Sequence, residues 1–145
     1  MGDDFDRRYW DDVWNGDDGR AAAMASAAPN PHLIREVAAL TPGTALDAGC
    51  GAGAEAVWLA SRGWRVTGVD ISAAALGRAA ERAAVAGVED PLAWVEADLC
   101  DWDPGTRFDL VATHYVHASV PQLDLYLRLA RMVAPGGTLL IVGHG

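Results

Sequence analysis

Short apolar runs alternate with longer stretches of helical periodicity from residue 44 to residue 142. The runs have the length of strands, and the stretches between them carry apolar residues along one helical face. Strands that alternate with helices are joined by right-handed crossovers into a parallel sheet with helices on both faces. We therefore predict an α/β, doubly wound sheet of about five strands. The expected strands are residues 44–46, 64–69, 92–95, 108–112 and 138–142, and the expected helices are residues 32–40, 53–61, 72–86 and 122–133.

Residues at the expected helix ends agree with this division. Asn30 is a favourable N-cap, and Pro31 suits the first position of the helix that follows. Ser72 is a second N-cap, and Gly87 is the expected C-cap of the same helix.

The first 28 residues have a different pattern. Between residues 3 and 20, acidic residues are mixed with aromatic ones, and Trp10 and Trp14 share a helical face. The sequence Pro29-Asn30-Pro31 separates this segment from the rest of the chain. We therefore divide the chain into an N-terminal arm, residues 1–28, and one domain, residues 29–145.

Composition narrows the class of protein. A chain of 145 residues with 51% hydrophobic residues is typical of a single globular domain. The formal net charge of −9 disfavours nucleic acid as a partner. No apolar run approaches the ~18 residues that span a bilayer. The acidic N-terminus does not resemble a secretory signal, which predicts a cytoplasmic protein. Cys50 and Cys100 are too few for a disulfide framework or a zinc site.

A glycine-rich loop follows the first expected strand. In Asp47-Ala48-Gly49-Cys50-Gly51-Ala52-Gly53 the glycines allow a sharp turn and let a ligand approach the backbone. Gly49, Gly51 and Ala54 also satisfy the G-x-G-x-x-[GA] pattern, so a nicotinamide cofactor is an alternative ligand. Asp47 favours a cationic or amino-bearing ligand, because its charge would repel a pyrophosphate.

Two further carboxylates follow expected strands. Asp70 comes after the second strand, and Asp98 comes after the third. Open α/β sheets bind ligands at the carboxyl ends of their strands. Together with Asp47, these residues indicate a ligand site at that edge of the sheet.

These segments resemble the motifs of class I S-adenosylmethionine-dependent methyltransferases, in the same order, over roughly residues 30–143. The resemblance implies S-adenosylmethionine as cofactor, S-adenosylhomocysteine as product and a small molecule as methyl acceptor. Tyr9, Trp10 and Trp14 also resemble the start of the tellurite-resistance and thiopurine methyltransferase groups, in which an N-terminal segment covers the cofactor. The matching motif segments are residues 46–53, 69–70, 97–99, 108–111 and 129–140.

The resemblance also implies roles for single residues. Asp47 lies near the ammonium of the methionine moiety, and Asp70 accepts hydrogen bonds from both ribose hydroxyls. Asp98 takes the adenine amino group, with Leu99 or Cys100 against the ring. The main chain at Thr113 or His114 closes over the methionine end. The implied cofactor-binding residues are Trp14, Asp47, Gly49, Cys50, Gly51, Gly53, Asp70, Ile71, Ala97, Asp98, Leu99, Thr113 and His114.

The candidates for acid–base chemistry follow the fourth strand. Methyl transfer from a sulfonium mainly needs alignment and a dry site, and a general base is needed only when the acceptor is a hydroxyl or a protonated amine. The candidate bases are His114, Tyr115 and His117, with His144 after the fifth strand. A histidine at this place in the family usually positions the substrate. Two histidines three residues apart in a loop do not make a metal site, and no metal is expected.

The sequence ends after the fifth expected strand, where family members continue with a helix and an antiparallel hairpin. Residues 138–142 are therefore expected to form an unprotected edge strand, which favours a homodimer. Three functions stay open: a small-molecule methyltransferase, a cofactor-binding module without turnover, and an NAD(P)-dependent oxidoreductase domain. The acceptor is not predicted, because acceptor pockets are built from loops without a shared motif.

Overall fold

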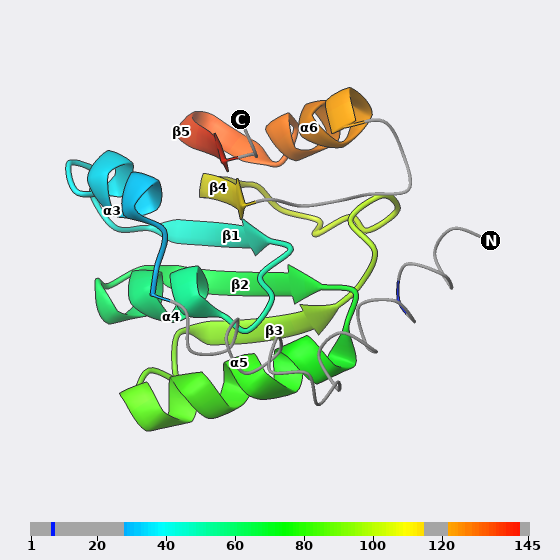
Figure 1. The fold of residues 1–145 in the computed structure, drawn as a ribbon. Helices are drawn as coiled ribbons and strands as arrows, with labels where there is room; N and C mark the ends of the chain where they lie inside the picture. The colour runs from blue at the N-terminus through cyan, green and yellow to red at the C-terminus, as the bar shows by residue number, and fades with distance from the viewer. Residues whose placement is uncertain (1–6, 8–27, 115–121, 143–145) are drawn as a thin grey trace.

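The computed structural model describes residues 7, 28–114 and 122–142. The described strands form one sheet of order β3-β2-β1-β4-β5, and all four pairs of neighbours are parallel. The arrowheads of β1, β2 and β3 point the same way in Figure 1. The expected α/β, doubly wound sheet is thus confirmed. The strands are β1 (Thr44–Ala48), β2 (Arg65–Asp70), β3 (Leu92–Glu96), β4 (Phe108–His114) and β5 (Val133–Val142).

The described helices are α3 (Pro31–Val37), α4 (Ala54–Ser61), α5 (Ala73–Ala86) and α6 (Gln122–Ala130). The expected caps are confirmed: the His32 N–H donates to Asn30 Oδ1 over 2.8 Å, and the Ala75 N–H donates to Ser72 Oγ over 3.2 Å. Gly87 ends α5 in the left-handed conformation. None of the helices in the described ranges is long and apolar enough to cross a membrane.

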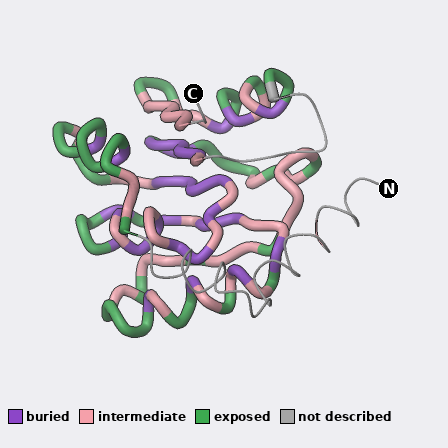
Figure 2. The backbone as a smooth tube through the Cα atoms, in the orientation of Figure 1, coloured by how far each residue is buried: buried purple, intermediate pink, exposed green. Residues whose placement is uncertain are grey.

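Two apolar cores lie on opposite faces of the sheet. Because strand side chains alternate between the faces, Ala45 packs with α3 and α4, whereas its neighbour Leu46 packs with α6. Helix α5 packs beside α4 and over β2 and β3. Figure 2 shows buried residues along the central strands and exposed ones on the outer sides of the helices. Helices therefore cover both faces, as predicted.

Two boundaries near the N-terminal end of the domain differ from the expected ones. Strand β1 continues two residues further, to Ala48, because Ala48 still pairs with Val69 on one side and with Thr113 on the other. Asp47 therefore lies in the strand and not in the loop. Helix α3 ends at Val37, three residues before the expected end at Leu40.

The largest difference concerns the Pro-Gly-Gly sequence. The helix expected over 122–133 ends at Ala130, and β5 begins at Val133 instead of Thr138. Val133 pairs with Phe108, and regular pairing resumes between Thr138 and Leu110, so Pro135-Gly136-Gly137 form an irregularity inside the ladder. A Cβ on Gly137 would lie 2.8 Å from the Asp109 carbonyl oxygen. The missing side chain lets the two backbones approach this closely.

Candidate functional site

The alternation of side chains brings three predicted site residues to one face at the carboxyl edge of the sheet. Asp47 follows Ala45 by two residues in β1, Asp70 ends β2, and His114 ends β4. By the period of two, Asp47 and His114 share the face on which Ala45 and Ala112 pack with α4. Because β2, β1 and β4 are neighbours in the sheet, these polar groups line adjacent strand ends.

The glycine loop crosses this edge and is anchored to β2. The Gly49 and Cys50 N–H groups both donate to the Val69 carbonyl, over 2.8 and 2.9 Å. Gly53 starts α4 with φ 84°, and a Cβ there would lie 2.9 Å from the Ala79 Cβ. Only glycine fits this backbone conformation and this close approach of α4 to α5. The loop thus runs beside the strand ends, held by backbone hydrogen bonds to β2.

Asp70 anchors the glycine loop and also accepts a hydrogen bond from Ser72, the N-cap of α5. Its Oδ2 accepts from the Gly51 N–H over 2.8 Å, and its Oδ1 accepts from the Ser72 N–H over 2.9 Å. Each hydrogen bond favours the ionised carboxylate.

Asp47 is a buried carboxyl group with one oxygen left without a hydrogen bond in the described part of the chain. It is 2% exposed, and its Oδ2 has no hydrogen-bond partner among the described residues. Burial raises the pKa of Asp47 well above its usual range, and the charges of Glu55 and Asp70 raise it further. A buried acceptor without a donor is costly in free energy unless a ligand supplies the donor.

His114 and Glu55 face each other beside Asp47. The Nδ1 of His114 lies 3.9 Å from Oε1 of Glu55, and the two side chains are 6% and 19% exposed. Burial lowers the pKa of His114 to about 4, with a further contribution from the charge of His32. Burial raises the pKa of Glu55 to about 7, against the opposing charge of Arg82. Both ring nitrogens of His114 are buried without a hydrogen-bond partner among the described residues.

The sequence analysis missed Glu55. An acidic residue in the first turn of a helix is favoured by the helix dipole alone, so its position in α4 did not mark it as part of a site. Its place two residues after the last glycine of the loop was the available signal.

The segment after β3 lies next to the end of β2. Ala97 N–H donates to the Asp70 carbonyl over 3.0 Å, and Asp98 Oδ1 accepts from the Cys100 N–H over 2.8 Å. The Leu99 carbonyl accepts from Arg128 over 2.9 Å. The segment predicted to hold adenine therefore lies next to the end of β2.

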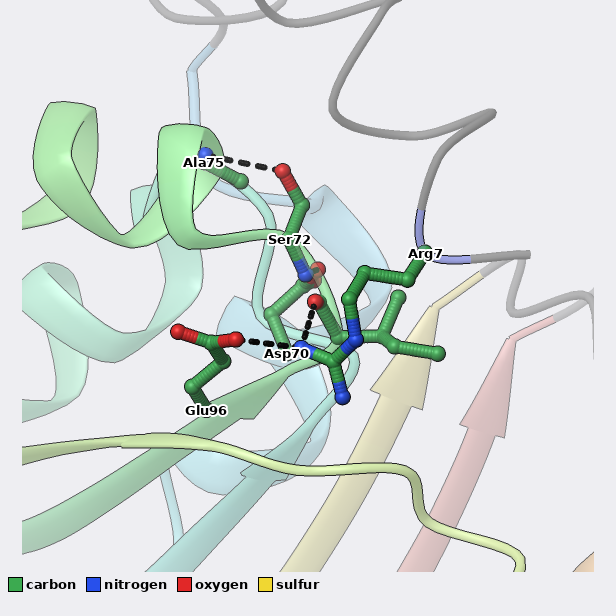
Figure 3. A network of polar contacts seen from close by, with 6 residues as sticks. Arg7, Asp70, Ser72, Ala75 and Glu96 are labelled. Carbon is green, nitrogen blue, oxygen red and sulfur yellow. Dashed lines mark hydrogen bonds and ion pairs between the residues drawn. The ribbon is translucent and has the colours of Figure 1, made fainter. Parts of the chain in front are cut away.

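Arg7 is a second residue that the sequence analysis missed. Its guanidinium donates to the Ile71 carbonyl over 2.9 Å and forms an ion pair with Glu96, as Figure 3 shows. Glu96 pairs with Asp70 across the β2–β3 ladder. Arg7 thus contacts the ends of β2 and β3, a contact over 89 positions of sequence that no local pattern marks.

The remaining predicted residues have other surroundings. Thr113 is 1% exposed, and its hydroxyl donates to the Ala48 carbonyl over 2.9 Å, which ties β4 to β1. Burial raises the pKa of the Cys50 thiol well above its usual range. Trp14, Tyr115, His117 and His144 lie outside the described residues. Within the described ranges no group of three or more potential ligands is arranged to hold a metal ion.

A cavity lies away from this edge, between α4 and α5. It has a volume of about 570 Å³, and Trp58, Arg78 and Val85 are among its lining residues. None of the predicted site residues lines it. The buried polar atoms at the strand ends are therefore the stronger indication of a ligand site.

The fold and this edge define an α/β protein with a glycine loop and carboxylates at adjacent strand ends. A family described as "Methyltransferase domain" matches residues 45–137, which include β1, the glycine loop, β2, β3 and β4. The chain belongs to the class I S-adenosylmethionine-dependent methyltransferases. Membership in this family favours S-adenosylmethionine over a nicotinamide cofactor.

Known proteins give further comparisons. The chain is 37% identical over 109 residues to a "Ribosomal RNA small subunit methyltransferase C" from Alcanivorax borkumensis, covering 71% of this chain and 33% of that protein. It is 37% identical over 121 residues to a "Trans-aconitate 2-methyltransferase" from Paracidovorax citrulli, covering 78% of this chain and 43% of that protein. The chain thus spans between a third and a half of these relatives.

A solved structure shows the same fold over most of the chain. It comes from work entitled "Conversion of a Disulfide Bond into a Thioacetal Group during Echinomycin Biosynthesis" and has a TM-score of 0.73 and 30% sequence identity. The likeness covers 93% of this chain and 57% of that one.

Proposed function

We propose that this chain binds S-adenosylmethionine at the carboxyl edge of β1, β2 and β4 and transfers its methyl group to a small molecule. The observation that carries the proposal is a set of buried polar atoms beside the glycine loop that have no hydrogen-bond partner in the described part of the chain: Oδ2 of Asp47 and both ring nitrogens of His114. Buried polar groups of native proteins are nearly always hydrogen-bonded, and a ligand with several donors would satisfy these.

The residues fit the proposed cofactor. Asp47, buried at the end of β1, is proposed to pair with the ammonium of the methionine moiety, and Asp70, which anchors the glycine loop, is proposed to accept from the ribose hydroxyls. The loop glycines, Gly49, Gly51 and Gly53, leave room for close approach to the main chain. Ile71, Ala97, Asp98 and Leu99 are proposed for the adenine side, and Cys50, Thr113 and His114 for the methionine side.

In methyl transfer the bound cofactor supplies a methyl group on a positively charged sulfur. The chain then has to hold the acceptor in line and exclude water. With a pKa of about 4, His114 is a neutral imidazole at pH 7. It accepts hydrogen bonds but retains a proton weakly, so we propose that it positions the acceptor. Tyr115 and His117 keep their predicted role as candidate bases.

The acceptor is proposed to be a small molecule. One relative is named for trans-aconitate, and another is named for ribosomal RNA. The net charge of −9 on this chain disfavours a polyanionic acceptor, because RNA binding relies on neutralising phosphates. Turnover with an RNA fragment, and with no small acceptor, would contradict this choice.

Two measurements test the proposal in sequence. Calorimetric titration with S-adenosylmethionine and, separately, with NADH distinguishes the cofactor classes. An assay for S-adenosylhomocysteine formation with a panel of small acceptors then tests turnover. Binding without turnover would indicate the alternative of a cofactor-binding module. Absence of S-adenosylmethionine binding would contradict the proposal as a whole.

We also propose that residues 1–28 form an arm over the cofactor site, including Trp14, and that residues 29–145 form the binding domain. The contact of Arg7 with Ile71 and Glu96 supports an arm that reaches this edge. Bound cofactor should slow proteolysis near residues 16–19. Equal cleavage rates with and without S-adenosylmethionine would argue against the arm.

A homodimer through β5 is a further proposal. Within the described sheet β5 lies at the edge, with β4 as its neighbour, and residues 138–142 carry no charge or proline that would block pairing. Sedimentation equilibrium should detect a dimer, and a monomer at high concentration would contradict it. The cytoplasmic location and the absence of a membrane partner remain predictions.

A further inference from the structure

Three carboxyl groups and one imidazole crowd the strand ends around the glycine loop. Asp47 is 2% exposed and Glu55 is 19% exposed at its side chain, so water screens neither charge effectively. Within residues 7, 28–114 and 122–142, neither Asp47 Oδ2 nor the ring nitrogens of His114 have a hydrogen-bond partner. A bound ligand could supply the missing hydrogen bonds of this cluster.

Charged and titratable groups face the cluster from every surrounding element. Positive charge reaches the cluster from α5, where Arg82 lowers the pKa of Glu55, and from α3, where the charge of His32 lowers the pKa of His114. The groups are Asp47 from β1, Asp70 from β2, His114 from β4, Glu55 from α4, His32 from α3, Arg82 from α5 and Cys50 from the glycine loop.

Three neighbouring carboxyl groups in a buried site do not all ionise. Like charges at short range disfavour the second and third ionisation, and burial adds to the effect. Asp70 accepts two backbone N–H groups, which favour its charged form. The proton is then left to Asp47 and Glu55, which titrate together as a pair.

We propose that the carboxyl pair of Asp47 and Glu55 holds one proton in the empty site and releases it to solvent when the cationic methyl donor binds. This inference rests on the proposed function. The O–H bond of one carboxyl group breaks, the proton goes to the buffer, and the resulting carboxylate faces the positive charge of the ligand. Glu55 thereby selects for cationic ligands, because only a positively charged ligand gains interaction energy when the pair loses its proton.

The sign of the pH dependence follows from the proton released. At low pH the pair is protonated, and the ligand has to displace the proton before it gains the charge interaction. Affinity for S-adenosylmethionine should therefore rise with pH, by up to about tenfold per pH unit while one proton is released, and then level off. The pKa of Glu55, which burial raises to about 7, puts this rise near neutral pH.

The experiment is calorimetric titration of the full chain at pH 6.5 in two buffers of different ionisation enthalpy. The ligand's own α-amino group stays protonated at this pH. The enthalpy difference between the buffers gives the number of protons released, and we expect between roughly half and one per S-adenosylmethionine bound. Adenosine, which carries neither ammonium nor sulfonium, should release none. Binding of S-adenosylmethionine without proton release overturns the inference, whereas absence of binding overturns the proposed function.

A matched pair of variants tests the role of Glu55. In Glu55→Gln the charge opposing Asp47 is gone, so Asp47 ionises at lower pH and proton release at pH 6.5 should fall at least twofold. Glu81→Gln removes an exposed carboxylate of α5 and should leave release unchanged. Equal release from wild type and Glu55→Gln would remove Glu55 from the pair. If Glu55→Gln does not fold, titration of the Glu55 side-chain carboxyl by ¹³C NMR in wild type, with and without S-adenosylmethionine, decides instead. A carboxyl signal that titrates identically in both states overturns the inference.

Discussion

The aspartates at the two ends of the central strands differ in burial and in hydrogen bonding. At the amino end, Asp109 of β4 is exposed, and its Oδ2 accepts from the Thr44 N–H over 3.0 Å and from the Thr44 hydroxyl over 3.2 Å. At the carboxyl end, Asp47 is buried, and its Oδ2 has no partner among the described residues. The same residue type is satisfied at one end and left unsatisfied at the other.

This difference indicates that the two ends of the sheet have different roles. Asp109 joins β4 to the start of β1 across 65 positions of sequence, which stabilises the register of the two strands. Asp47 Oδ2 and the ring nitrogens of His114 have no such bond among the described residues, and burying unsatisfied polar atoms reduces stability. A ligand can complete such groups, so the amino end of the sheet stabilises the domain, whereas the carboxyl end is where we propose the site.

Asp70→Ala should have the largest effect, and it should act on binding. The variant loses the proposed bonds to the ribose and the anchors on Gly51 and Ser72. Affinity for S-adenosylmethionine should fall by about 1.5–3 kcal/mol, as measured by calorimetric titration. Circular dichroism checks the fold. Unchanged affinity in a folded variant would remove Asp70 from the site.

Glu55→Gln should stabilise the empty protein at alkaline pH. The pKa of Glu55 is raised from 4.5 to about 7, so the folded protein keeps a proton that the unfolded chain loses above pH 4.5. Wild-type stability therefore falls as pH rises from 4.5 through 7, whereas glutamine does not titrate. Urea unfolding should show the variant more stable at pH 8 by on the order of 1–3 kcal/mol, with the difference closing at pH 4.5. A difference that does not depend on pH would contradict the raised pKa.

Asp109→Ala should affect stability and leave binding alone. It removes the acceptor of the Thr44 N–H and hydroxyl groups at an exposed site, so the free energy of unfolding should fall by about 1 kcal/mol. Urea unfolding measures this loss, and titration with S-adenosylmethionine is the companion measurement. A loss of affinity similar to that of Asp70→Ala would abolish the distinction between the two strand ends.

Arg7→Gln should have the smallest effect. The ion pair joins side chains that are 36% and 47% exposed, so it should contribute at most about 1 kcal/mol to stability. Unfolding at low ionic strength and at 1 M salt should show a difference from wild type that shrinks with salt. A difference that persists at high salt would indicate that the bond to the Ile71 carbonyl, and not the ion pair, is the main contribution.

Local sequence patterns predicted most of the fold. The caps at Asn30, Ser72 and Gly87 and the alternation of strands with helices depend on residues close together in the chain, so they were recognised correctly. The helix before β5 was expected to continue to residue 133, and the strand was expected to begin at residue 138. Pairing of Val133 with Phe108 overrides that local preference, and pairing partners 25 positions apart are not visible in a local pattern.

The sequence by itself determined the class of protein, the glycine loop and the carboxylates at the strand ends, because spacing along a strand dictates which residues reach its carboxyl edge. Tertiary structure alone decided how those groups behave. Glu55 and His114 lie 59 positions apart, and only the packing of α4 on the sheet brings them within 3.9 Å and removes them from water. Burial and neighbouring charge, not residue type, determine which of these groups holds a proton at neutral pH.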